Sequence, residues 1–326
     1  MKRVSFALIL LLAGCASEVP VVVREAAPRA LPPPSGPRWK VASVSHSLAR
    51  PPVPDGLSGI TRRPDGRFLS IEDSDGRLWT LDVAIDVTNG VLKSCAIPGH
   101  VKLDGVVDGE GCAWDPLRGT VWVSDEVGPF VTEFDPMTGK RLGELALTDD
   151  FRRIRPNRGP EGLTISPDGL TLWTCPEEAV NGDGPLASQT NGTFVRLHRY
   201  VRKSGSEPWR HAAEYPYHAD PFGGAPYRDA SASGVSGLCA LPDGTLLVLE
   251  RELSVKGFMP SFRLRLYEFG RDLQKHLLLD RDTGLEMYEG ICLVERKPDG
   301  SLVLLLVSDG DSIPLETLML VTLAPS

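Results

Sequence analysis

Basic residues are in the minority in this chain of 326 residues, where 35 lysines and arginines stand against 43 aspartates and glutamates for a net charge of −8. Binding to nucleic acid is dominated by contacts between a basic face and phosphates, so this balance argues against a nucleic-acid partner. Beyond the N-terminus no apolar run is long enough to cross a bilayer. The most apolar segment, residues 302–307, is typical of a buried strand.

Motifs of several common catalytic and cofactor sites are also absent. The six histidines are scattered along the chain and follow no zinc-ligand spacing. The chain has no Gly-x-Ser-x-Gly element of α/β-hydrolases, no Walker loop and no dinucleotide-binding loop. These absences exclude the zinc sites, serine hydrolases and nucleotide-binding sites that such motifs identify.

The N-terminus carries an export signal. Lys2 and Arg3 precede the apolar residues 4–12, and Leu12-Ala13-Gly14-Cys15 then matches the pattern at which bacterial lipoproteins are cleaved and lipidated. We therefore predict a signal peptide over residues 1–14 and lipidation at Cys15, which would hold the chain at a membrane. An ordinary secretory signal with an incidental cysteine is the alternative.

The segment after Cys15 bears on location and domain organisation. Ala16 stands where aspartate would favour the inner membrane, which indicates an outer-membrane lipoprotein of the cell envelope that faces the periplasm. Residues 15–38 are rich in proline and predict an extended tether. Residues 39–326 are then enough for one large all-β domain.

A repeat of about fifty residues organises that domain. Each copy begins with Ser-Gly or Glu-Gly, and four of the five copies continue through a Pro-Asp-Gly turn into an apolar strand. The first residues of these motifs are Ser58, Glu110, Glu161, Ser236 and Glu289. A period near fifty with short strands is typical of a β-propeller blade.

The repeat predicts an all-β fold, a β-propeller of five four-stranded antiparallel blades. The fifth copy is one strand short, and residues 40–46 could supply that strand and close the ring. The third copy is longer than the others because of two stretches rich in glycine, proline and asparagine, around 181–191 and 217–234. Six blades stay open as an alternative if this copy conceals a degenerate blade.

The Glu-Gly motifs should place three carboxylates at one mouth of the central channel. Glu110, Glu161 and Glu289 stand at the starts of presumed innermost strands, where they would repel one another unless protonated or bound to a cation. Several hard oxygen ligands suit Ca²⁺ better than zinc. We therefore predict a calcium site, with strand capping by backbone amides as the alternative.

A second acidic set follows the second strand of each copy. These carboxylates could support a metal or contact a substrate, and the alternative is that they are solvated loop residues. The set comprises Glu72, Asp73, Asp125, Glu126, Glu177, Glu178, Glu250, Asp309 and Asp311.

Arginines close to these acidic positions are candidate anion ligands. Arg155 and Arg158 precede Glu161 in Arg-Pro-Asn-Arg-Gly-Pro-Glu, and Arg251 follows Glu250. A guanidinium group binds phosphate or carboxylate by two parallel hydrogen bonds. We predict that these three arginines bind a substrate, with neutralising ion pairs to the acidic residues as the alternative.

Several of these elements together resemble the phytase-like family, also described as "esterase-like activity of phytase". The matching elements are residues 108–111, 122–126, 157–163 and 304–309, and the similarity covers nearly all of residues 52–323. The Glu-Gly strand starts also resemble those of gluconolactonase-type calcium propellers. The resemblance implies a secreted propeller with a phosphoester or ester substrate.

Two functions follow as expectations. In the first, the chain is a calcium-dependent hydrolase of phosphoesters or related esters, in which Glu110, Glu161 and Glu289 hold the metal and the arginines bind a small anionic substrate. In the second, it is a non-catalytic binding or scaffold propeller with structural calcium or none. An open coordination position within reach of the arginines would favour the hydrolase.

Overall fold

The computed structural model describes residues 36–47, 54, 56–226, 232–270, 272–310 and 317–326. The predicted signal peptide, the lipidation site at Cys15 and all but the last residues of the tether lie outside the described residues. Within the described part of the chain no helix is long and apolar enough to cross a membrane.

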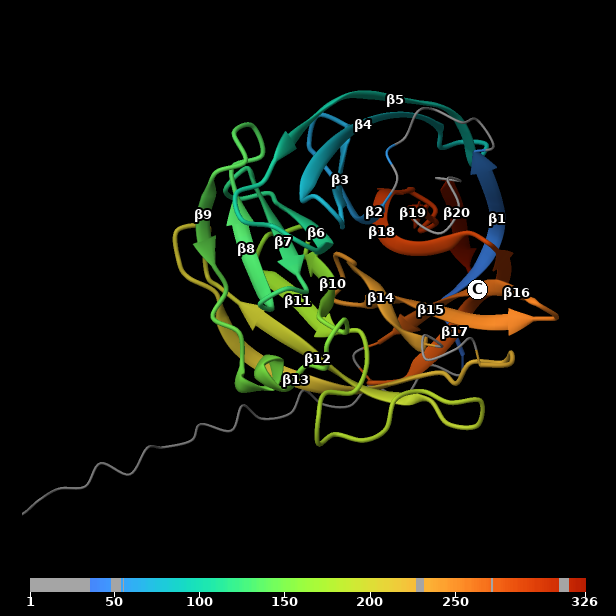
Figure 1. Cartoon of the computed structure of the whole chain (residues 1–326). Helices are drawn as coiled ribbons and strands as arrows, with labels where there is room; N and C mark the ends of the chain where they lie inside the picture. The colour runs from blue at the N-terminus through green and yellow to red at the C-terminus, as the bar shows by residue number, and fades with distance from the viewer. Residues whose placement is uncertain (1–35, 48–53, 55, 227–231, 271, 311–316) are drawn as a thin grey trace, which may run out of the picture. The chain divides into compact units, whose positions relative to one another are not determined.

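The described strands form five four-stranded antiparallel sheets around a central channel (Figure 1). The first blade contains β2 (Leu57–Arg62), β3 (Phe68–Glu72), β4 (Arg77–Asp86) and β5 (Val91–Lys102). The second contains β6 (Gly109–Asp115), β7 (Thr120–Asp125), β8 (Phe130–Phe134) and β9 (Arg141–Glu144). The third contains β10 (Pro160–Ile165), β11 (Thr171–Pro176), β12 (Thr193–Val201) and β13 (Arg210–Ala219).

The fourth blade contains β14 (Ala232–Ala240), β15 (Leu246–Lys256), β16 (Met259–Phe269) and β17 (Lys275–Gly284). The fifth contains β18 (Met287–Arg296), β19 (Leu302–Asp309), β20 (Leu318–Pro325) and, as its outermost strand, β1 (Trp39–Ser47). A short 3₁₀ helix, η1 (Asp149–Arg153), connects the second and third blades.

The N-terminal strand closes the ring, as the sequence predicts. β1 pairs antiparallel with β20, and the innermost strands contact one another in the cycle β2, β6, β10, β14, β18 and back to β2. The five-blade prediction is confirmed. All described strands belong to five sheets, and the described extra residues of the third copy lie in loops after β11 and β13, so the alternative of a sixth blade is wrong.

The core lies between neighbouring blades. Leu247 and Leu249 of β15 pack with Leu304 and Leu306 of β19, and all four side chains are fully buried. Burial of one leucine contributes about 1.5–3 kcal/mol relative to exposure. The same packing recurs between the other blades, so the alternation of apolar residues in each copy holds the ring together.

The structure explains why each innermost strand carries the Ser-Gly or Glu-Gly motif. In all five innermost strands the pairing register shifts at the motif residue. Such a shift is a β-bulge, and it takes the motif side chain out of the regular pairing. The glycine that follows lies against the next blade. A Cβ at Gly290 would lie 2.3 Å from the Ser58 carbonyl oxygen, and one at Gly111 would lie 2.5 Å from that of Glu161. Only glycine permits this approach.

Candidate functional site

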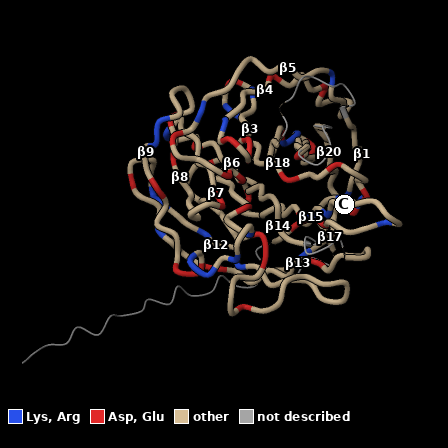
Figure 2. Tube along the Cα trace, viewed as in Figure 1, with Lys and Arg blue, Asp and Glu red and all other residues tan. Residues whose placement is uncertain are grey.

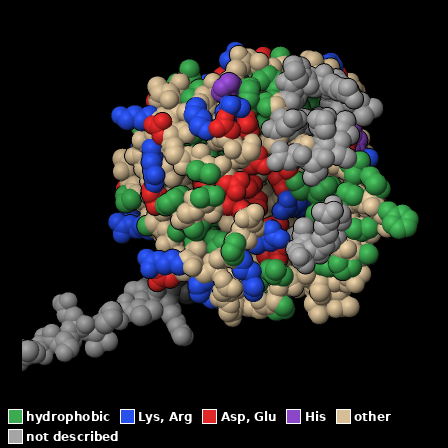
Figure 3. Space-filling model, viewed as in Figure 1, with side chains coloured by type: hydrophobic (Ala, Val, Ile, Leu, Met, Phe, Trp, Pro, Cys, Tyr) green, Lys and Arg blue, Asp and Glu red, His purple; other side chains and the backbone are tan. Residues whose placement is uncertain are grey.

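Acidic side chains gather at the end of the channel where the innermost strands begin, a region we call the acidic mouth. Figure 2 shows these residues near the centre of the ring, and Figure 3 shows the same acidic surface with basic side chains beside it. The acidic mouth comprises Asp108, Glu110, Glu126, Glu161, Glu177, Glu178 and Glu289.

Two groups of three carboxylates in the acidic mouth could each hold a cation. The first is Asp108, Glu110 and Glu126, and the second is Glu126, Glu161 and Glu177. In each group one ligand atom per residue lies within 4.8 Å of the others. Glu126 belongs to both groups, so the two candidate positions adjoin. This spacing and the hard oxygen donors fit Ca²⁺.

Burial of the acidic mouth disfavours the charged form of its carboxyl groups. Desolvation, followed by the charges of Glu289 and Glu126, raises the pKa of Glu110 well above its usual range. Desolvation and the charges of Glu110 and Glu177 do the same to the pKa of Glu161. These groups must hold protons, pair with arginine or bind a cation.

Hydrogen bonds satisfy only some of the carboxylate oxygens in the acidic mouth. The Ser58 hydroxyl donates to Glu110 Oε2 at 2.8 Å, and the Gly159 amide donates to Glu126 Oε1 at 2.7 Å. Glu161 is 4% exposed, and its Oε2 is buried without a hydrogen-bond partner among the described residues. A buried oxygen of this kind is the acceptor that a bound cation would satisfy.

Arg251 bridges two carboxylates of the acidic mouth. Its Nη2 donates to Glu177 Oε1 and its Nη1 donates to Glu289 Oε1. The charges of Glu177, Glu289 and Glu161 raise the pKa of Arg251 against the opposing effect of burial, which is the largest single influence. The guanidinium group is thus a fixed positive charge beside the candidate metal positions.

Arg158 also reaches the acidic mouth. Its Nη1 lies 3.3 Å from Glu177 Oε2 and its Nε lies 3.2 Å from Glu178 Oε1. The backbone explains this placement: Asn157 has a φ of 52°, a left-handed conformation that asparagine tolerates, and Gly159 packs against the Cα of Glu126. The Asn-Arg-Gly element therefore forms the turn that directs Arg158.

Arg155 is engaged differently from the other two predicted anion ligands. Its Nε and Nη2 donate to the carbonyl oxygens of Ala179 and Gly184, both at 2.9 Å. These bonds tie it to the loop between β11 and β12. Among the three arginines, Arg158 and Arg251 contact carboxylates of the acidic mouth, whereas the described bonds of Arg155 support a loop.

The structure distributes the three predicted metal ligands unequally. Glu110 and Glu161 each belong to one of the two groups, together with the predicted second-set residues Glu126 and Glu177. Glu289 belongs to neither group and instead accepts from Arg251. Asp108, which the repeat does not mark as a ligand, completes the first group. Its position two residues before Glu110 was the available signal.

Asp311 of the second acidic set lies outside the described residues. Most of its described members are buried, so the alternative of solvated loop residues is wrong for Glu72, Asp125 and Glu250. Glu72 accepts from Trp79 Nε1 at 2.6 Å, and Asp125 accepts from the amides of Val107 and Val127, both at 2.8 Å. Glu250 accepts from the Tyr217 hydroxyl at 2.6 Å. These three carboxylates hold strands and loops in place.

The channel narrows immediately beyond the acidic mouth. A space of about 10 Å³ remains there, lined by the bulge glycines and by Glu161, Ser236 and Glu289. This is close to the smallest volume that holds one water molecule. We call this constriction the waist, and it separates the acidic mouth from the opposite end of the channel.

Comparison with known proteins gives relatives of low identity. A protein named "Uncharacterized secreted protein" from Arthroderma benhamiae is 28% identical over 172 residues, which cover 41% of this chain and 32% of the relative. The match thus spans about a third of that protein's length.

Similar solved structures are weak matches. The PQQ-bound aldose sugar dehydrogenase of Streptomyces coelicolor is 13% identical, with a TM-score of 0.46 over 86% of this chain and 99% of that one. The tail fiber of Staphylococcus aureus phage P68 is 12% identical, with a TM-score of 0.46 over 83% of this chain and 50% of that one. Likenesses at this level carry no argument about activity.

The family comparison is more extensive. Residues 54–312 match the phytase-like family, described as "Esterase-like activity of phytase". The matched range begins just before β2, ends just after β19, and so includes every residue of the acidic mouth. The chain therefore belongs to the phytase-like family of β-propellers.

Proposed function

We propose that the acidic mouth binds Ca²⁺ and that the chain is a calcium-dependent hydrolase of phosphoesters or related esters. The observation that carries this proposal is the pair of adjoining carboxylate groups, which share Glu126 and have Arg158 and Arg251 beside them. Membership of the phytase-like family supports an ester or phosphoester as the substrate class.

The charge balance supports a cation in the acidic mouth. Among the described residues, two arginines form ion pairs with the seven carboxylates of the acidic mouth, and Glu161 has a buried oxygen with no partner there. Two guanidinium groups offset only part of this charge in a low-dielectric setting. Asp108, Glu110, Glu126, Glu161 and Glu177 are the residues that would hold calcium.

The chain's own cations fit an anionic substrate. The side chain of Arg158 is 21% exposed and that of Arg251 is 15% exposed, so both are partly accessible from solvent. Each could orient a phosphate or carboxylate group by hydrogen bonds while it also contacts Glu177. When bound, calcium would neutralise the carboxylates and polarise an oxygen of the substrate.

We further propose that the protein acts in the cell envelope as a lipoprotein. The export pattern that ends at Cys15 and the secreted description of the Arthroderma benhamiae relative support this location. A lipid anchor followed by the proline-rich tether would keep the propeller near the membrane surface.

A second candidate is a scaffold or binding propeller in which calcium is structural. The observation that favours it is that both arginines already pair with carboxylates: Arg158 with Glu177 and Glu178, and Arg251 with Glu177 and Glu289. Such pairing neutralises the buried charge without a substrate. A measurement of ester and phosphoester hydrolysis distinguishes the two candidate functions.

The test is hydrolysis by the full chain of 4-nitrophenyl phosphate, 4-nitrophenyl acetate and a six-membered lactone, with 1 mM Ca²⁺ or with a chelator. We expect calcium-dependent turnover of one substrate class and a loss of about 100-fold or more in Glu161→Gln. Glu144→Gln is the matched control, because Glu144 is exposed on β9 and its one ion pair among the described residues is with Arg141.

Turnover that persists with the chelator, or equal turnover in Glu161→Gln, would contradict the hydrolase proposal. Calcium binding that raises the melting temperature with no turnover of any substrate would favour the scaffold. Circular dichroism of each variant separates loss of activity from loss of fold.

A further inference from the structure

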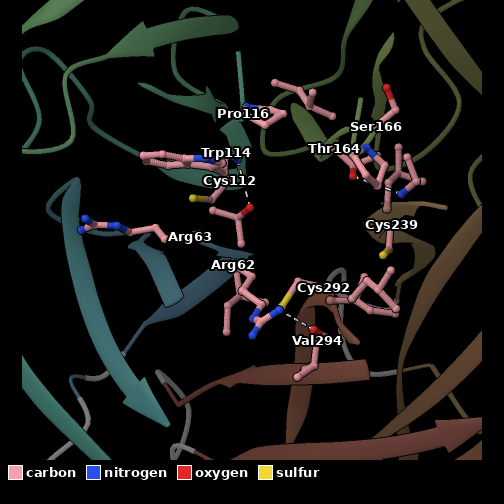
Figure 4. A pocket seen from close by; sticks show the side chains of 18 of the residues that line it. Arg62, Arg63, Cys112, Trp114, Pro116, Thr164, Ser166, Cys239, Cys292 and Val294 are labelled. Atoms are coloured by element: carbon pink, nitrogen blue, oxygen red, sulfur yellow. Dashed lines mark hydrogen bonds between the residues drawn. The ribbon is translucent and has the colours of Figure 1, made fainter. Parts of the chain in front are cut away.

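A second cavity occupies the opposite end of the channel, where the innermost strands end. Its volume is about 460 Å³, within the range of small-molecule sites. All five blades line it, through the last residues of β2, β6, β10, β14 and β18 and the turns that follow some of them. Figure 4 shows these side chains around the cavity. We call this cavity the far pocket.

The floor of the far pocket is apolar. Ile60, Leu163, Leu238 and Ile291 occupy the same position in four copies of the repeat, two residues after the bulge, and all four line the pocket. The free thiols of Cys112, Cys239 and Cys292 line it too, where they act as small hydrophobic groups. The apolar body of a ligand would gain free energy by leaving water for this surface.

Two hydrogen-bond donors in the far pocket lack acceptors. Trp114 Nε1 and Arg63 Nε are both buried without a hydrogen-bond partner among the described residues. The Arg63 guanidinium lies 5.7 Å from the centre of the Trp114 ring, and its Nη2 lies 3.1 Å from Asp65 Oδ2. Both nitrogens are enclosed by protein atoms and do not face the open space of the pocket, so a ligand would meet the part-exposed Arg63 guanidinium rather than these two donors.

The charge of the far pocket is opposite to that of the acidic mouth. Its lining contains Arg62, Arg63 and Arg296 but only one carboxylate, Glu295. Arg62 is fixed because its Nη1 donates to the Val294 carbonyl oxygen at 2.7 Å, a bond drawn in Figure 4. This excess of positive charge favours a ligand with an anionic group, such as a carboxylate.

We propose that the far pocket binds a small organic anion with an apolar body, of the aromatic carboxylate class. The carboxylate would pair with the arginines of the lining, Arg62, Arg63 and Arg296, and the apolar body would lie on the floor. The waist between the two ends holds only about 10 Å³, so this site is separate from the acidic mouth and does not depend on the proposed hydrolysis.

The test is calorimetric titration of the full chain with 2-naphthoate and with its uncharged analogue 2-naphthalenemethanol. We expect saturable binding of 2-naphthoate at one site and binding at least tenfold weaker for the alcohol. Arg63→Gln should weaken 2-naphthoate binding about tenfold or more.

Glu161→Gln is the matched control at the other end of the channel and should leave 2-naphthoate binding unchanged. No saturable binding of 2-naphthoate would overturn the proposal. So would equal affinity for the acid and the alcohol, or unchanged binding in Arg63→Gln. Arg63 is part-exposed and its one described ion pair is with Asp65, so this variant tests binding without disturbing the core.

Discussion

The two ends of the channel are built from the same five strands, and they differ in charge, burial and polarity. At the acidic mouth, carboxylates meet at the strand starts, and the motif residues Glu161 and Glu289 are no more than 5% exposed. At the far pocket, three arginines and an apolar floor meet at the strand ends. The bulge at each motif residue separates these two sets of side chains along the strand.

The difference shows how one repeat can build two unlike sites. Position in the copy decides which end a residue reaches, since the motif residue lies at one mouth and residues two to seven positions later line the other. The bulge glycines fill the space between them, because each permits close contact with the neighbouring blade. Changes at one end should therefore leave the other end intact.

The largest expected effect of a single change is at the acidic mouth. Arg251→Met removes the cation that bridges Glu177 and Glu289, and it should lower the free energy of unfolding of the metal-free chain by about 3–5 kcal/mol. Urea denaturation measures this change. The control, Arg152→Met, removes an arginine whose side chain is 84% exposed and should have almost no effect. Equal stability of the two variants would show that Arg251 does not offset buried charge.

A smaller loss is expected at the waist. Gly290→Ala places a Cβ 2.3 Å from the Ser58 carbonyl oxygen and 2.6 Å from Val307 Cγ1, and it should cost about 1–3 kcal/mol of unfolding free energy. In the control, Gly143→Ala on β9, the nearest atom would lie at 3.4 Å. If thermal melting finds both variants equally stable, the close approach of blades does not explain the motif glycine.

The smallest effect is a pH dependence confined to the acidic mouth. Desolvation, with the charge of Glu177, raises the pKa of Glu178 to about 8, and desolvation with Asp309 raises that of Glu289 to about 8. The folded chain thus holds protons that the unfolded chain releases near pH 4.5. Stability from these groups is complete below that pH and is lost as the pH rises towards 8.

Between pH 6.5 and 8 we expect each of these two groups to lower the unfolding free energy of the metal-free chain by about 1–2 kcal/mol. Glu178→Gln should reduce the slope of stability against pH, whereas Arg63→Gln at the far pocket should leave it unchanged. Denaturation at several pH values gives these slopes. A stability that rises with pH, or the same slope in Glu178→Gln and the parent, would contradict the assignment.

The architecture could be predicted from the sequence because the repeat is local. Pro-Asp-Gly turns set the hairpins, and Gly244 and Gly300 adopt positive φ values of 83° and 86° there. The missing strand of the fifth copy predicted ring closure, which β1 supplies. The length of the third copy left a sixth blade open, because sequence alone does not separate a long loop from a degenerate strand.

The acidic mouth was only partly predictable. The position of Glu110, Glu161 and Glu289 in the repeat indicated that they converge, but not which neighbours would complete each carboxylate group. Glu126 and Glu177 lie after second strands, and their direction depends on pairing register. Glu289 lies beside Arg251, a pairing between blades that no spacing within a copy reveals.

The far pocket was missed for a similar reason. Arg63 and Trp114 belong to different copies and occupy different positions in them, so no motif joins them. They meet because β2 and β6 are neighbours in the ring. The cysteines gave a partial signal, since Cys239 and Cys292 share one repeat position, yet their burial in the channel wall follows from the closed ring.

The measurement that tests the central claim most directly is calorimetric titration of the metal-free full chain with Ca²⁺, beside Glu161→Gln and Arg63→Gln. We predict saturable calcium binding by the parent, at least tenfold weaker binding by Glu161→Gln and unchanged binding by Arg63→Gln. Absence of saturable binding, or equal affinity in the parent and Glu161→Gln, would contradict a calcium site in the acidic mouth.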